Sequence, residues 1–177
     1  MNSDKGRDLL VQARQSFLRG QITPESANRI IDDLILVNAH SPQKEIVLWL
    51  DSIGGDSESA FKICNTIKAI SSPVTAKVIG QANSSAFLVL QYCNKREAGQ
   101  LATLMLHTIS RKNVELKDIR ERGLRALEET ERLQEIYEQI ISARSGQAKE
   151  EVARLCMEGR IMSATEALSL GFLDEIY

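Results

Sequence analysis

A strand-to-helix turn is encoded by the stretch Val78-Ile79-Gly80-Gln81-Ala82-Asn83-Ser84-Ser85-Ala86-Phe87. A strand-like run comes first, a glycine turns the chain, and two serines stand at the start of an apolar helical segment. A serine at such a turn projects from the backbone, beside the unpaired N–H groups of the first helical turn. Those groups can receive developing negative charge. The stretch therefore predicts an activated serine, Ser84, as in a serine hydrolase.

The residues before this stretch predict a parallel α/β sheet. Residues 45–50 form a nearly continuous apolar run, typical of a parallel strand with helices on both faces. A turn is expected at 51–56, a second strand at 74–79, and between them a helix that ends near Pro73. Its apolar face is Ala60, Ile63, Cys64 and Ile67. A strand, a helix and a parallel strand in this order form a right-handed crossover unit.

An earlier helix is expected over residues 23–38. Thr23 is its predicted N-cap and Pro24 its first residue. Its apolar face is predicted to hold Ile30, Ile31, Leu34 and Leu36. Strand, helix and strand signals together favour an α/β fold.

Residues 113–144 predict a long amphipathic helix. Its apolar stripe consists of Leu116, Ile119, Leu127, Leu133, Ile136, Tyr137 and Ile140. The predicted length exceeds that of usual helices more than twofold, so part of it is expected to pack on another subunit. Two helices broken near Gly123 are an equally weighted alternative. Further helices are expected over 149–158 and after a capping box at 163–166, the last of them ending at Gly171.

Composition points to one domain, residues 1–177, in the cytoplasm. The hydrophobic share is 43%, the charged share is 26% and the formal net charge is −2, so nucleic-acid binding is not expected. Cys64, Cys93 and Cys156 are far apart in sequence, which suits reduced thiols and argues against structural zinc. No membrane anchor and no cofactor are expected, because the apolar runs are strand-sized and no metal-ligand cluster is present.

A serine nucleophile needs a base, and the chain contains only two histidines, His40 and His107. His40 follows a helix in a polar context, where an exposed turn residue is the ordinary interpretation. His107 follows the short strand candidate 104–106, and active-site groups often occupy such strand tips. His107 is therefore the predicted base. Backbone N–H groups of Gly55 and Ser85 are the predicted oxyanion hole.

The order of these motifs resembles the proteolytic subunit of the Clp protease, ClpP, over most of the chain. Residues 17–22 and the following helix resemble that family's opening strand and first helix. Residues 51–55 resemble its Asn-Ser-Pro-Gly-Gly turn, 80–84 its Gly-Gln-Ala-Ala-Ser nucleophile motif, and 105–107 its Met-Ile-His segment. The long helix resembles the family's handle, which interlocks two rings.

The resemblance implies a ClpP/crotonase-like fold of repeated β-β-α units, with a mainly parallel sheet and a protruding handle helix. It also implies a serine-type endopeptidase that cleaves unfolded polypeptides inside a homo-oligomeric ring of two stacked heptamers. An AAA+ ATPase unfoldase is the implied partner. Ser84 and His107 are the implied catalytic residues, and Gly55 and Ser85 the implied oxyanion hole.

Two departures from the family pattern matter. Ile53 stands where the family usually has proline. Gly159 stands where forward counting from Gly146 places the catalytic aspartate, and the adjacent Glu158 is a possible substitute acid. Neighbouring side chains point in different directions, which weighs against this substitution.

Three functional hypotheses follow. The first is a peptidase in which Ser84 and His107 act with an incomplete triad. The second is a weakly active or inactive ClpP-like subunit with a structural or regulatory role, motivated by Gly159. The third is an acyl-CoA enzyme of the crotonase type, whose related fold would suit residues 159–168, although the Ser84 motif and the short chain argue against it.

Overall fold

The computed structural model describes residues 3–109 and 116–177. The sequence of elements begins with a short helix that the sequence analysis did not predict. The elements are α1 (Ser3–Gln12), β1 (Gln15–Ile22), α2 (Pro24–His40), β2 (Ile46–Gly55), α3 (Ser57–Ala69), β3 (Val74–Asn83), α4 (Ser85–Tyr92), β4 (Lys95–Ala98), β5 (Thr103–Met105), α5 (Leu116–Ser145), α6 (Lys149–Glu158), β6 (Ile161–Ser163), α7 (Ala164–Ser169) and β7 (Glu175–Ile176).

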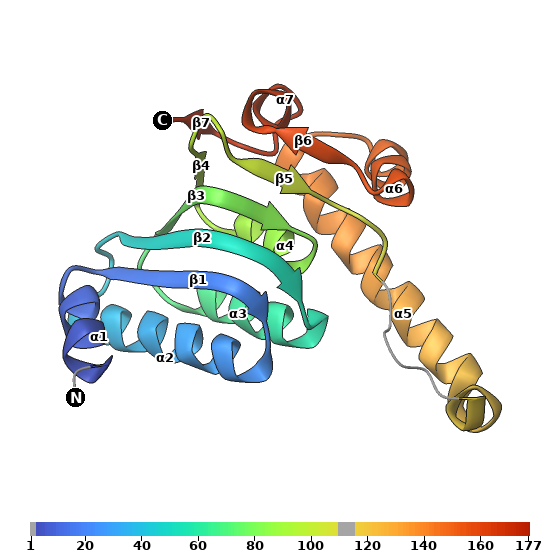
Figure 1. Ribbon diagram of the computed structural model, residues 1–177, viewed down its shortest axis with the longest axis horizontal. Helices are drawn as coiled ribbons and strands as arrows, with labels where there is room; N and C mark the ends of the chain where they lie inside the picture. Colours follow the sequence, from blue (N-terminus) through green and yellow to red (C-terminus); the bar gives the residue numbers. More distant parts are fainter. Residues whose placement is uncertain (1–2, 110–115) are drawn as a thin grey trace.

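The strands form one mainly parallel sheet, as predicted (Figure 1). Its order is β1-β2-β3-β4-β7, with parallel pairing between neighbours. The short strand β5 pairs in parallel with the end of β3, and β6 pairs antiparallel with β5. The end of β5 therefore lies beside the end of β3, which determines the position of the site.

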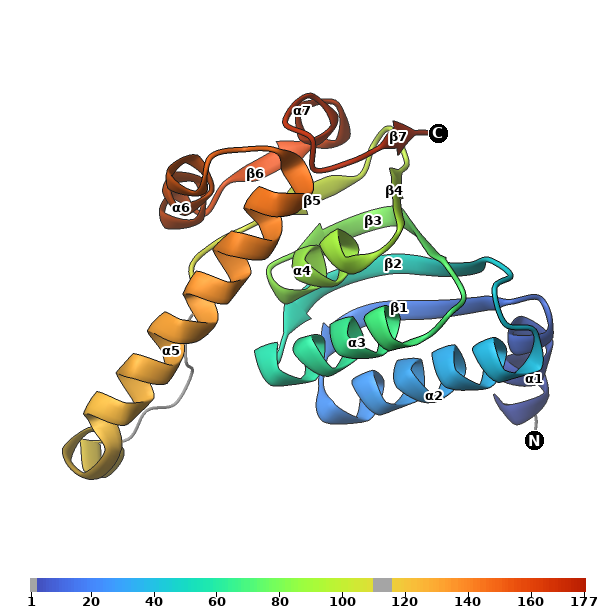
Figure 2. The same cartoon turned by 180° about the vertical axis from the view of Figure 1, so that it is seen from behind.

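Helices α2, α3 and α4 cover one face of the sheet (Figure 2). The prediction that helices flank residues 45–50 on both faces is wrong. Exposure alternates along β2: Leu48 and Leu50 are buried, whereas Val47 and Trp49 are only half-buried. The second face carries aromatic side chains, with Trp49 stacked on Phe17 at a centroid distance of 6.1 Å. Residues 45–50 are therefore nearly continuously apolar because alternate side chains face the helix-covered core and the aromatic surface on the other side of the sheet.

The central strands run further than their apolar segments. The predicted turn at 51–56 is wrong, because β2 continues to Gly55 and Asp56 caps α3 by accepting from the Ser59 N–H at 2.8 Å. The predicted turn at Gly80 is also wrong, because β3 continues to Asn83. Register shifts in the pairing of β2 with β1 and β3 allow these extensions. Bulged strands keep pairing where hydrophobic alternation has already stopped.

Helix α2 begins as predicted, but its buried face differs from the predicted apolar face at one position. The Thr23 hydroxyl accepts from the Ser26 N–H, and the Ser26 hydroxyl accepts from the Thr23 N–H. Leu36, predicted to be on the buried face, is 54% exposed, and Val37 is buried instead. The spacing Ile30, Leu34, Val37 follows the helical period of one stripe, which Leu36 leaves by about 100°.

Helix α5 is continuous over 30 residues and passes through Gly123, so the alternative of two helices is wrong. Residues 113–115 of the predicted helix lie outside the described residues. Its C-terminal part is anchored by Tyr137 and Ile141, both buried, whereas Leu127 is 55% exposed. Figures 1 and 2 show the N-terminal half of α5 leaving the body of the protein.

Helices α6 and α7 form where they were predicted. Ser163 caps α7 by accepting from the Glu166 N–H at 3.2 Å. The Glu166 carboxylate pairs with Arg160 instead of returning to the cap, so only half of the predicted capping box is present. Gly171 follows the helix at φ 74°.

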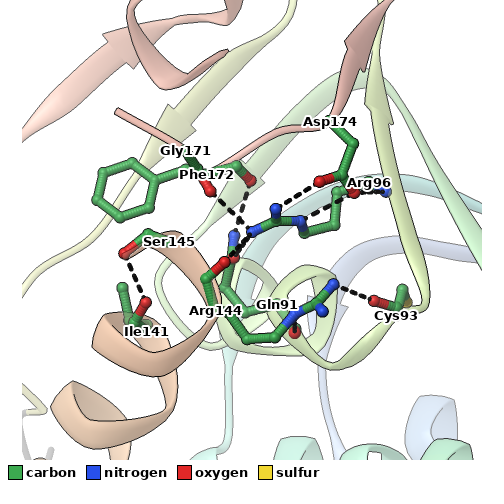
Figure 3. Close-up of polar contacts among 9 residues, drawn as sticks. All are labelled: Gln91, Cys93, Arg96, Ile141, Arg144, Ser145, Gly171, Phe172 and Asp174. Carbon is green, nitrogen blue, oxygen red and sulfur yellow. Dashed lines mark hydrogen bonds and ion pairs between the residues drawn. The ribbon is translucent and has the colours of Figure 1, made fainter. Parts of the chain in front are cut away.

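A buried arginine, Arg96, connects the C-terminal end of α5 to the C-terminal segment of the chain (Figure 3). Arg96 in β4 is 5% exposed and pairs with Asp174 at 2.5 Å. Its guanidinium also donates to Gln91 Oε1 at 2.7 Å and to the carbonyl oxygens of Gly171 at 2.9 Å and Arg144 at 3.3 Å. We refer to Gln91, Arg96, Arg144, Gly171 and Asp174 as the Arg96 network. It joins three segments that are distant in sequence, namely 91–96, the end of α5 at Arg144 and 171–174, and so fixes where α5 leaves the body.

Candidate active site

Ser84 lies at the strained turn between β3 and α4. Its backbone has φ 55° and ψ −124°, a conformation that a residue other than glycine adopts at an energetic cost. The Ser84 N–H donates to the Met105 carbonyl at 2.7 Å, which ties the turn to the end of β5. Its side chain forms no capping bond to α4. The ordinary interpretation, a helix-capping serine, therefore does not apply.

His107 is brought to Ser84 by the pairing of β5 with β3. Asn83 is in register with Met105, so the residues just beyond both strands lie side by side. His107 Nε2 lies 2.7 Å from Ser84 Oγ, within hydrogen-bond distance. The sequence-predicted pair is therefore in contact. His40 lies at the exposed end of α2, in keeping with the sequence interpretation.

Two glycines bring the end of β2 against the nucleophile turn. A Cβ on Gly54, at φ 84°, would lie 2.5 Å from the Asn83 carbonyl oxygen and 2.8 Å from Ser84 Cβ. A Cβ on Gly55, at φ 153°, would lie 2.2 Å from the Ile22 carbonyl oxygen. All three distances are shorter than real contacts permit. Glycine at these positions therefore results from close backbone approach and backbone conformation together.

The two predicted oxyanion-hole residues contact each other. The Gly55 N–H donates to Ser85 Oγ at 2.8 Å. The Ser85 N–H belongs to the first turn of α4, where amides have no acceptor within the helix. An oxyanion bound by both amides must replace the Ser85 hydroxyl at the Gly55 N–H.

Glu158 does not reach the imidazole. Its carboxylate pairs with Arg154, one turn earlier in α6. Gly159 ends α6 at φ 62°, and a Cβ at this position meets no heavy atom within 4 Å. A side chain at residue 159 would thus face open space. In this structure the Glu158 carboxylate, considered from the sequence as a substitute acid, is paired with Arg154 and not with His107.

The part of α6 nearest to His107 is apolar. The Thr108 N–H donates to the Cys156 carbonyl at 3.1 Å, so the end of α6 lies beside the segment that carries the base. The buried side chains of this helix are Val152, Leu155 and Cys156. Among the side chains of residues 6–109 and 125–177, no aspartate or glutamate pairs with His107.

A small cavity of about 20 Å³ adjoins the Ser84–His107 pair. Ser84, Ser85, His107 and Tyr137 contribute its polar groups, and Ser57, Phe61, Leu88 and Ile109 complete its lining. Sequence reasoning missed Tyr137 as a site residue, because its spacing in the 113–144 stripe is that of an ordinary core position.

The described residues hold no cluster of side chains suited to a metal ion. In the same residues, no helix combines the length and apolarity needed to cross a bilayer. Cys64, Cys93 and Cys156 are buried free thiols. Burial raises the pKa of Cys93 to about 12, which keeps this thiol protonated and unreactive.

A parallel α/β sheet that presents a serine at a strained strand-to-helix turn, with an imidazole on its hydroxyl, is typical of serine hydrolases. The model of one family, described as Clp protease, matches residues 2–177. The chain belongs to this family, and its mixed α/β fold is that of a ClpP-like peptidase.

Proposed function

We propose that this protein is a serine endopeptidase that cleaves peptides and unfolded polypeptides, with Ser84 as nucleophile and His107 as general base. One observation carries the proposal: the 2.7 Å contact of His107 Nε2 with Ser84 Oγ at a turn held in a strained conformation. Membership of the Clp protease family supports peptide hydrolysis as the reaction.

The proposed reaction begins with the neutral imidazole. His107 Nε2 accepts the Ser84 hydroxyl proton as Oγ attacks the carbonyl carbon of the peptide. The N–H groups of Gly55 and Ser85 stabilise the resulting oxyanion. His107 then donates the proton to the leaving amine, and water hydrolyses the acyl-enzyme by the same sequence of proton transfers.

The test is hydrolysis of a fluorogenic peptide and of an unfolded protein, together with labelling by a fluorophosphonate, which modifies activated serines. Both reactions must depend on Ser84. Labelling reports the nucleophile even when turnover is slow, which matters because no carboxylate of the described side chains pairs with His107.

The Ser85 hydroxyl competes with substrate for the Gly55 amide. We expect Ser85→Ala to raise kcat/KM for a peptide about 5-fold, because one hydrogen bond of about 1 kcal/mol no longer has to be exchanged. Ser85→Thr, which retains a hydroxyl, is the matched control. Lower activity in Ser85→Ala than in wild type would show that the hydroxyl instead helps to hold the oxyanion.

A second candidate function is a weakly active or inactive subunit with a structural or regulatory role. It is favoured by the absence of a carboxylate on His107 among the described residues. Absence of Ser84 labelling in folded, assembled protein would support it. The family match gives no support to the acyl-CoA alternative.

We further propose assembly into a ring homo-oligomer of two stacked heptamers, served by an AAA+ ATPase unfoldase. Family membership supports assembly, and the protruding half of α5, with Leu127 exposed, supports contact between rings. An acid substituted at Leu127 should weaken that contact by burying a charge.

Sedimentation velocity should show wild-type particles at a multiple of 19.7 kDa and particles of half that mass for Leu127→Glu. Leu101→Glu, at a 94% exposed loop position away from α5, is the control. A stable monomer at micromolar concentration contradicts assembly, and full-size Leu127→Glu particles contradict the role of α5.

A further inference from the structure

The Tyr137 hydroxyl is a buried polar group without a partner. Tyr137 is 2% exposed, and its Oη forms no hydrogen bond in the described part of the chain. Leaving such a group unpaired carries a desolvation cost, so buried polar groups are normally bonded to protein or water. A phenylalanine would fill the same apolar position without this cost. The hydroxyl therefore calls for a functional explanation.

The second ring nitrogen of His107, Nδ1, also needs a hydrogen-bond partner. For Nε2 to accept the Ser84 proton, the neutral imidazole must carry its own proton on Nδ1. That N–H requires an acceptor, which is a carboxylate in a complete triad. Among the side chains of residues 6–109 and 125–177, none forms an ion pair or hydrogen bond with Nδ1.

The residues that carry both groups line one cavity. His107 and Tyr137 line the space of about 20 Å³ beside Ser84. A space of about 10–15 Å³ is enough for one water molecule, provided that polar groups hold it. The cavity is thus large enough for one water and too small for a side chain.

We propose that Tyr137 is a positioning residue: its hydroxyl accepts the hydrogen bond of His107 Nδ1–H through one water molecule in this cavity, in place of a carboxylate. The proposal rests on the Ser84–His107 chemistry proposed above. A neutral phenol orients the imidazole and selects its tautomer, but stabilises the imidazolium less than a carboxylate does. The expected enzyme is accordingly slower than one with a full triad.

Burial keeps the Tyr137 hydroxyl and the neighbouring Cys156 thiol in their neutral forms. Burial raises the pKa of Tyr137 well above its ordinary value, and Cys156 nearby adds to the shift. Burial likewise raises the pKa of Cys156 to about 12, with Glu138 of α5 the second cause. Cys156 from α6 and Glu138 of α5 are thus titratable groups near Tyr137.

The activity test compares Tyr137→Phe with wild type between pH 5 and 9. The substitution removes only the hydroxyl, and Tyr92→Phe, at the far end of α4, is the matched control. We expect Tyr137→Phe to lower kcat about 10-fold with KM unchanged, as one hydrogen bond to the base is lost. The acid limb of the kcat profile should move to lower pH, because the imidazolium loses its acceptor. Unchanged kcat and acid limb, or a change in KM alone, would overturn the proposal.

A second measurement does not require activity. With [¹³Cε1]histidine, only His40 and His107 give signals, and His40→Gln assigns them. Tyr137→Phe should lower the titration midpoint of His107 and leave that of His40 unchanged. An unchanged His107 midpoint refutes the role of Tyr137 even in an inactive protein. If the fluorophosphonate does not label Ser84 in the folded wild-type protein, the proposed peptidase is refuted. The histidine titration still tests whether Tyr137 interacts with His107 in that case.

Discussion

We expect Ser84→Ala to abolish both peptide hydrolysis and fluorophosphonate labelling. Turnover should fall at least about 10³-fold, because removal of a serine nucleophile leaves only the catalysis due to binding and oxyanion stabilisation. The alanine keeps the turn between β3 and α4, where the Ser84 side chain makes no capping bond. Folding and assembly should therefore be retained, as measured by circular dichroism and sedimentation.

Two controls make this result specific. Ser169→Ala removes an exposed hydroxyl that donates to the Glu166 carbonyl in α7, and it should leave hydrolysis unchanged. Glu158→Ala should also leave hydrolysis unchanged, since that carboxylate pairs with Arg154. A marked loss in Glu158→Ala would restore Glu158 as the substitute acid. Equal inactivity of folded wild type and Ser84→Ala would favour the noncatalytic subunit.

Arg96→Met should cause the largest loss of stability. Methionine fills much of the same volume but leaves Asp174 without its buried partner and three acceptors of the Arg96 network unpaired. Breaking a fully buried ion pair costs about 3–5 kcal/mol, and because the Asp174 side chain is 35% exposed we expect a loss at the lower end of this range. For a chain of this size, we expect the thermal midpoint to fall by about 10 °C. Differential scanning calorimetry measures this change.

Arg154→Met is the matched control, because Arg154 is exposed and its pairs with Glu151 and Glu158 lie on the surface of α6. Exposed pairs contribute about 0–1 kcal/mol, so its thermal midpoint should change little. Equal effects of the two substitutions would contradict the importance of the Arg96 network.

The same network predicts a dependence on pH. Hydrogen bonding to Arg96 lowers the pKa of Asp174 below its ordinary value. A lowered pKa means that the stabilisation by this carboxylate is complete above about pH 4 and is lost as the pH falls through the folded-state pKa. Asp174→Asn should therefore be less stable than wild type at pH 7, with a difference that shrinks in acid. Urea unfolding at pH 7 and pH 3 measures it, and a constant difference would contradict this role.

Local patterns were sufficient for the central strands, most helices and the central pair of the site. Thr23 and Pro24 mark the start of α2 because capping depends on neighbouring residues. Ser84 was predictable because a strand, a tight turn and a helix leave a recognisable pattern, and His107 because only two histidines compete for the role of base. Gly54 and Gly55 were recognisable as a turn, although the reason for them, close approach to Asn83 and Ile22, was not.

The sequence by itself thus determined the α/β class, the Ser84–His107 pair and the long helix, since these depend on periodicity, caps and composition within short segments. Only the tertiary structure decided that Glu158 pairs with Arg154, that the Ser85 hydroxyl occupies the Gly55 amide, and that Tyr137 and His107 line one cavity. Each of these contacts depends on where distant segments pack, or on the direction of one side chain at the end of a helix. Hydrophobic periodicity marks Tyr137 as buried, but it carries no information about what a buried hydroxyl meets.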